Sequence, residues 1–240
     1  MRLPLFLVFY IFMAFLIGSC GRNSPRIVYE EDTIDEEETS DTTRIKVAEL
    51  PVFFDSTDVL LHPVGWTVLE ESRGLKLRSG SYSGADFVNS YSFGDEVEGD
   101  FNNVIFEKRD GRKTQLTDKK VTITSVTFLR EFFYSTKRKY LLYKVRDKDT
   151  NNDNSLDLRD LESLYISTLE GTGFEKLSPE MHDFYEGKLI SSFNRYYFST
   201  QEDINKDGRF TKHDRLHYFY IAFDSSGYKV ERYDPLAPIK

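Results

Sequence analysis

Short runs of aromatic and β-branched residues, separated by polar turn residues, recur from about residue 52 to residue 233. Runs of this length and composition favour β-strands. Turn signals rich in Asp, Ser, Thr and Gly lie between them, for example at residues 109–111, 170–173 and 224–227. No long helical periodicity is present, so the pattern predicts a mainly β body. The expected strands are residues 52–54, 59–62, 87–93, 103–107, 121–128, 140–145, 164–168, 188–192, 195–200, 217–223 and 228–233.

A repeat with a spacing of 54 residues runs through the second half of the chain. Each copy reads as strand, acidic loop, strand, glycine turn and strand, and the two copies span about residues 138–180 and 193–236. A shortened third copy is expected upstream, at about residues 104–116. Units of this length with several strands are typical of propeller blades. The recurring pairs are Asp149 and Asp203, Asn151 and Asn205, Asp153 and Asp207, Asp160 and Asp214, and Gly173 and Gly227.

Residues 163–179 resemble the closing hairpin of a TolB-type, WD40-like β-propeller blade, and the similarity spans about residues 100–236. Two or three blades are too few to close a ring. The resemblance therefore implies propeller-like antiparallel blades that are incomplete or open, unless the N-terminal part supplies degenerate strands. The acidic loops are then expected inside β-hairpins.

The second acidic loop, residues 203–214, has oxygen-bearing side chains at its first, third, fifth and twelfth positions. A hard cation such as Ca²⁺ takes six to eight oxygen ligands, which a tight turn can direct to one centre. Gly208 lies at the sixth position, where the backbone must turn sharply. The loop resembles an EF-hand or dockerin-type calcium loop, although its last residue is an Asp where EF-hands have Glu. The expected ligands are Asp203, Asn205, Asp207, the backbone carbonyl of Arg209, and Asp214.

The first acidic loop, residues 149–160, fits the same register. Asn154 replaces the glycine, and Asn tolerates a left-handed backbone better than most residues. Both loops are therefore predicted to bind Ca²⁺; the alternative is a pair of Asx-rich surface turns without metal. The expected ligands in this copy are Asp149, Asn151, Asp153, the backbone carbonyl of Ser155, and Asp160.

Two architectures suit such loops. Leu161, Leu164, Tyr165 and Leu169 could lie on one face of a dockerin-like helix. The equivalent stretch of the second copy, residues 217–223, is dense in β-formers. Because the copies align without gaps, one structure is expected for both, and loops between β-strands are favoured over a helical EF-hand pair.

The N-terminus has the order of a signal peptide. Arg2 precedes an apolar run at residues 5–17, and the small pair Gly18-Ser19 ends at Cys20. Residues 17–20 resemble the lipobox of bacterial lipoprotein precursors. This resemblance implies removal of residues 1–19, lipid on Cys20 and a place in the bacterial cell envelope, with the outer membrane expected. The alternative is an ordinary signal peptide followed by a chance cysteine.

Residues 20–45 are strongly acidic and carry almost no large apolar side chains, so they are expected to form a disordered tether. The alternative is a binding tail for a basic partner or divalent cations. The formal net charge of the chain is −8, which argues against a nucleic-acid partner. Residues 46–240 are expected to form the calcium-binding β-domain.

No catalytic motif is evident. In residues 80–84 a tyrosine, Tyr82, lies where a nucleophile elbow needs serine, and His182, His213 and His217 are read as structural or solvated. The expected function is a non-enzymatic, membrane-anchored lipoprotein that uses Ca²⁺ for stability and presents a surface to an envelope protein or glycan. An envelope enzyme that acts on glycans is the alternative.

Overall fold

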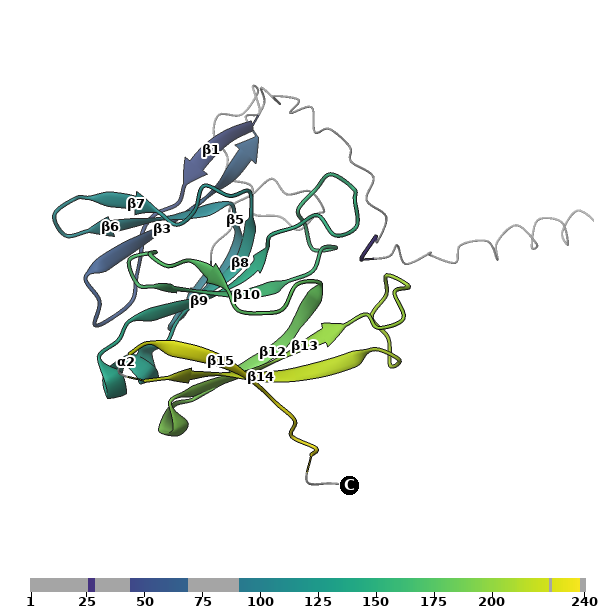
Figure 1. Ribbon diagram of the computed structural model, residues 1–240. Helices are drawn as coiled ribbons and strands as arrows, with labels where there is room; N and C mark the ends of the chain where they lie inside the picture. Colours follow the sequence, from purple (N-terminus) through teal and green to yellow (C-terminus); the bar gives the residue numbers. More distant parts are fainter. Residues whose placement is uncertain (1–25, 29–43, 69–90, 225, 238–240) are drawn as a thin grey trace, which may run out of the picture.

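The computed structural model describes residues 26–28, 44–68, 91–224 and 226–237 (Figure 1). These residues form a mainly β protein with three antiparallel sheets. One of the sheets is curled like half a barrel. The first sheet has β1 (Arg44–Ala48), β3 (Val59–Val68), β6 (Asn103–Lys108) and β7 (Lys113–Gln115), and β2 (Val52–Phe53) pairs with β3.

The second sheet has six strands and the third has four. In order across the second sheet lie β11 (Glu175–Lys176), β10 (Ser163–Thr168), β9 (Tyr140–Arg146), β8 (Thr122–Phe128), β5 (Glu96–Phe101) and β4 (Tyr91–Phe93). The third is a meander of β12 (His182–Ile190), β13 (Arg195–Glu202), β14 (Arg215–Phe223) and β15 (Tyr228–Tyr233).

The second sheet lies between the other two and is buried on both faces (Figure 1). Because successive side chains of a strand point to opposite faces, β9 contributes to two cores. Leu141 and Tyr143 pack in the first core, against the first sheet, and Tyr140 and Leu142 pack in the second core, against the third sheet. This double burial explains why β9 is almost continuously apolar.

A short helix, α2 (Arg130–Thr136), joins β8 to β9 and was not expected from the sequence. Phe132 on this helix is fully buried, and its ring centroid lies 4.3 Å from that of Phe223. The helix ends at Thr136, and Lys137 caps its C-terminus with a left-handed φ of 63°. The helix therefore belongs to the second core.

The prediction of a mainly β protein is confirmed, and both acidic loops lie inside antiparallel hairpins. The alternative of a helical EF-hand pair is wrong, because each loop leads from one strand into the next. The described residues provide three sheets, fewer than a closed propeller needs. The expected strand at 228–233 has the observed bounds, whereas the one at 188–192 does not, because β12 begins at His182 and Ser191 starts a 3-10 turn.

The expected signal peptide and Cys20 lie outside the described residues, as do residues 87–90 of one expected strand. Of the expected tether, residues 26–28 and 44–45 are described. Within the described part of the chain, no helix has the length and apolar character needed to cross a membrane.

Candidate metal centre

The two acidic loops occupy equivalent places in the fold. Residues 149–160 lie between β9 and β10, and residues 203–214 lie between β13 and β14. In both cases the flanking strands pair directly with each other, so each loop closes a hairpin. The ten expected ligand residues are thus divided between two corresponding hairpins of neighbouring sheets.

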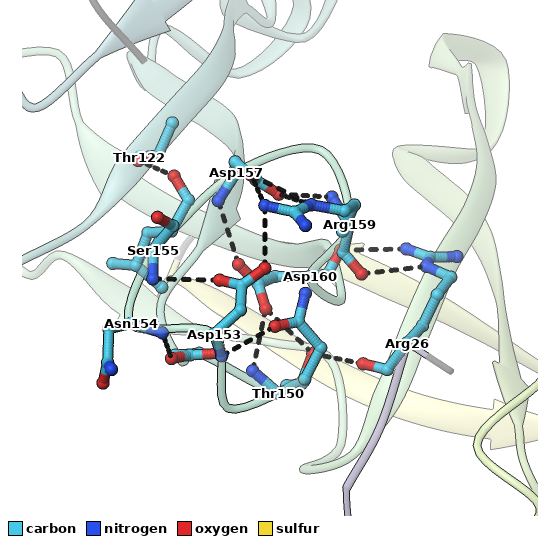
Figure 2. Close-up of polar contacts among 12 residues, drawn as sticks. Arg26, Thr122, Thr150, Asp153, Asn154, Ser155, Asp157, Arg159 and Asp160 are labelled. Atoms are coloured by element: carbon cyan, nitrogen blue, oxygen red, sulfur yellow. Dashed lines mark hydrogen bonds and ion pairs between the residues drawn. The ribbon is translucent and has the colours of Figure 1, made fainter. Parts of the chain in front are cut away.

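Side-chain oxygens of the first loop accept hydrogen bonds from its own backbone (Figure 2). Asp149 Oδ2 accepts from the Asn154 N–H at 2.7 Å, and Asn151 Oδ1 accepts from the Asp153 N–H at 3.0 Å. Asp153 Oδ1 accepts from the Ser155 N–H, also at 3.0 Å. The side chains of the first, third and fifth positions therefore converge on one turn.

The second loop repeats these hydrogen bonds position by position. Asp203 Oδ2 accepts from the Gly208 N–H at 2.7 Å, and Asn205 Oδ1 accepts from the Asp207 N–H at 3.1 Å. Asp207 Oδ1 accepts from the Arg209 N–H at 2.9 Å. Ser155 and Arg209, whose carbonyls are the expected seventh ligands, thus lie directly beside the fifth-position carboxylate of their own loop.

The backbone conformations of the two loops also agree with each other. The φ of Asn152 is 55° and that of Asn154 is 64°, and the equivalent Lys206 and Gly208 have φ of 57° and 75°. The left-handed conformation predicted for Asn154 is confirmed. Two loops with different sequences at these positions therefore share one backbone path.

The twelfth position closes both loops in the same way. Asp160 Oδ2 accepts from the Asp157 N–H at 2.9 Å, and Asp214 Oδ2 accepts from the Thr211 N–H at 2.5 Å. Asp160 is fully buried, and burial raises the pKa of its carboxyl group. Its other oxygen accepts from the Thr150 N–H at 2.8 Å, whereas the buried Oδ1 of Asp214 has no hydrogen-bond partner.

The loops differ in charge compensation. In the first loop Arg159 lies 2.7 Å from the carboxylates of both Asp153 and Asp157 (Figure 2), and its hydrogen bond lowers the pKa of Asp157. The residue equivalent to Arg159 in the second loop is the exposed His213. The second loop therefore has no arginine at this position.

Three residues of the expected tether bind to both loops, a feature that sequence reasoning missed. We call residues 26–28 the N-terminal strap. The Arg26 N–H donates to the Gly208 carbonyl at 2.7 Å, and the Val28 N–H donates to the Thr150 carbonyl at 2.7 Å. Ile27 between them is 2% exposed. The only sequence signal is a small apolar pair, Ile27-Val28, just before the acidic run.

A cluster of His182, Glu202 and His217 brings its ligand-type atoms within 4.8 Å of one another. Arg232 donates to Nδ1 of His217 at 2.7 Å, so the proton of a neutral His217 lies on Nε2, which faces Glu202 Oε2 at 2.6 Å. Both ring nitrogens of His217 are thus engaged. Burial and His217 lower the pKa of His182, and the hydrogen bond from His217 lowers that of Glu202. The side chains of this cluster thus have hydrogen-bond partners within the protein.

The outer face of the third sheet carries a group of tyrosines. Phe198 and Phe219 pack in the second core, so the alternating residues of the same strands lie on the opposite face. Ring centroids there are 5.6 to 6.0 Å apart, and the Arg195 guanidinium lies 4.2 Å from the centroid of Tyr220. We call this surface the tyrosine face; its members are Tyr197, Tyr218, Tyr220 and Tyr233.

A cavity of about 540 Å³ adjoins the tyrosine face, because Tyr218 and Tyr233 line both. Beyond these rings it is bordered by Arg215, Arg232 and Asp234. Aromatic surface beside a few polar groups is common in ligand sites.

Neither a scan against protein-family models nor a search of the curated proteins gives a match.

Proposed function

We propose that this chain is a non-enzymatic lipoprotein of the bacterial cell envelope whose β-domain binds two Ca²⁺ ions for stability. The observation that carries the calcium part is the agreement of the two loops in side-chain hydrogen bonds and left-handed positions. The two loops agree at positions one, three, five, six and twelve, and these include the ligand positions of a calcium loop. This agreement supports the proposal, because a hard cation takes several oxygens from one tight turn.

Calcium would supply positive charge that balances the mutual repulsion of the loop carboxylates. Each loop concentrates carboxylates, and Asp160 is a buried one whose ionised form is disfavoured by desolvation. A divalent cation offsets this repulsion, and its binding free energy adds to the free energy of unfolding. At a calcium concentration of one hundred times Kd, each site adds about 2.7 kcal/mol.

The direct test is thermal unfolding of the full chain in calcium and in chelator. We expect a higher Tm in calcium, and half of the increase or less in Asp149→Ala or Asp203→Ala, each of which removes one first-position ligand. Asp118→Ala, which removes an exposed carboxylate outside both loops, serves as the matched control. Equal Tm values in calcium and chelator would refute the calcium part of the proposal.

The anchor is the second part of the proposal. Lipid on Cys20 would bind the protein to a membrane, with the outer membrane as the proposed place. Two or three acyl chains, as in lipoproteins, give durable attachment where one alone is marginal. Radiolabelled palmitate should enter the chain, and Cys20→Ser should abolish both the label and the recovery in the membrane fraction. Labelling that persists in Cys20→Ser would refute the anchor.

The three sheets are proposed to be propeller-like blades, and the tyrosine face is the surface assigned to an envelope protein or glycan. Tyr and Arg are enriched at binding surfaces because each combines a large apolar area with polar groups. Tyr197→Ala should reduce capture of envelope components, whereas Tyr134→Ala, which removes an exposed tyrosine on α2, should not. Equal capture by both variants would exclude this face.

A further inference from the structure

The N-terminal strap holds the two loops together through backbone hydrogen bonds. It contacts Gly208 in the second loop and Thr150 in the first, and the Thr150 hydroxyl donates back to the Arg26 carbonyl at 2.8 Å. Ile27 is 2% exposed, whereas the neighbouring Val28 is 36% exposed. The strap is thus a docked segment with one buried apolar side chain.

The strap uses oxygens that a calcium ion does not need. Its backbone partners are the carbonyls of the second position of one loop and the sixth position of the other, Thr150 and Gly208. In a loop of this type the ligands are the side chains of positions one, three, five and twelve and the carbonyl of position seven. Docking of the strap and calcium binding are therefore compatible in the same loop.

The side chain of Arg26 adds further contacts between the N-terminal strap and the two loops. Its guanidinium donates to the Asp160 carbonyl at 2.9 Å (Figure 2) and pairs with Asp183 at the start of β12. It also lies 5.3 Å from the ring centroid of Phe210, the eighth residue of the second loop. Asp183 compensates its charge, so the strap brings little net positive charge to the loops.

We propose that the strap couples the two loops, so that calcium in either loop strengthens strap docking and raises the affinity of the other loop. The inference rests on the proposed calcium function. Ordering one loop fixes the strap and thereby positions its partner in the other loop. Such coupling is reciprocal: each site must affect the other by the same factor, and factors of about 5 to 150 are typical.

Calcium titration of the full chain by calorimetry tests the coupling. We expect two ions with positive cooperativity in the wild type, and two independent ions in Ile27→Ala, which removes the buried strap side chain without changing charge. The affinity in Ile27→Ala should fall by about tenfold at the second step. Val28→Ala is the matched control and should titrate like the wild type. Cooperativity that persists in Ile27→Ala would overturn the coupling.

A double-variant measurement gives a second route. Asp203→Ala should weaken calcium binding at the first loop in the wild-type background and have no such effect in the Ile27→Ala background. If Ile27→Ala does not fold, Arg26→Ala takes its place, since that side chain is 32% exposed. An equal effect of Asp203→Ala in both backgrounds would overturn the coupling.

Hydrogen exchange in chelator separates this inference from the proposed function. The strap variant should exchange faster than Val28→Ala at the amides of both loops, because the strap N–H groups no longer hold the Thr150 and Gly208 carbonyls and both loops open more often. Faster exchange in both loops without any calcium binding would refute the calcium function, and it would still support the view that the strap stabilises both loops. Unchanged exchange in both loops would refute the coupling, whether or not calcium binds.

Discussion

Two features of the structure, its backbone conformation and a close side chain, require a glycine at position 171. Its φ of 79° is left-handed, and a Cβ built at this position would lie 2.4 Å from a ring carbon of Phe106. Phe106 belongs to β6 in the first sheet and is 1% exposed, whereas Gly171 lies in the turn between β10 and β11 of the second. The contact is therefore part of the packing between two sheets.

Gly171→Ala should be strongly destabilising. A non-glycine residue in the left-handed region costs about 1–2 kcal/mol. Forcing a methyl group into a close-packed core adds about 1–3 kcal/mol, because the buried ring must move. The sum is about 2–5 kcal/mol in the free energy of unfolding.

Gly173→Ala is the matched control. Gly173 has a φ of 67°, but a Cβ there meets no atom within 4 Å, so this variant carries the backbone cost alone, about 1–2 kcal/mol. Urea denaturation, followed by circular dichroism, measures both. Phe106→Leu in the Gly171→Ala background should recover part of the loss. Equal destabilisation by the two alanine variants would refute the steric argument.

Three further predictions follow from local geometry. Gly208→Ala should lower the free energy of unfolding by about 1–2 kcal/mol and weaken calcium binding, because Gly208 has a left-handed φ. Gly208→Asn should lower the free energy of unfolding by less, because Asn154 occupies the equivalent position of the first loop. Denaturation and calcium titration measure these effects. Burial raises the pKa of Tyr143, so the stability that its neutral side chain provides is present below the pKa of the unfolded state, about 10, and is lost as pH rises. Between about pH 10 and 12 the Tm of Tyr143→Phe should therefore fall less steeply than that of the wild type. Burial and His217 lower the pKa of His182, so the stability that its neutral form provides is present above about pH 6.5 and is lost as pH falls. His182→Asn should therefore flatten the decline in Tm below about pH 6.5.

The acidic loops could be predicted because their geometry is local. The hydrogen bonds described above between the ligand side chains at the first, third and fifth positions and the backbone span at most five residues, as in Asp149 to Asn154. The largely apolar strand β9 could be predicted for a related reason, since both its faces are buried and most of its residues are therefore apolar.

The missed elements depend on contacts that composition does not encode. β5 reads Glu-Val-Glu-Gly-Asp-Phe, and only Val97 and Phe101 are buried, because an irregularity interrupts the pairing after Glu98. β12 is largely exposed and contains Gly187, where a Cβ would meet the Tyr196 hydroxyl at 2.1 Å. The strap needs Arg26 to contact Asp183, 157 residues away. No short pattern predicts such a pair.

On the proposed lipid anchor at Cys20, the strap would also limit how far the protein can stand from a bilayer. For a chain anchored at Cys20, Arg26 is only six residues along, which at about 3.3–3.6 Å per residue allows roughly 20 Å. With residues 26–28 docked on the loops, the acidic run that follows contributes nothing to this reach. If the strap detaches, 24 residues separate Cys20 from β1 at Arg44, and the greatest height that their length permits rises about fourfold, to roughly 80 Å. The distance between membrane and domain would then be set by the state of the loops, and calcium would act as a length adjustment for the anchor.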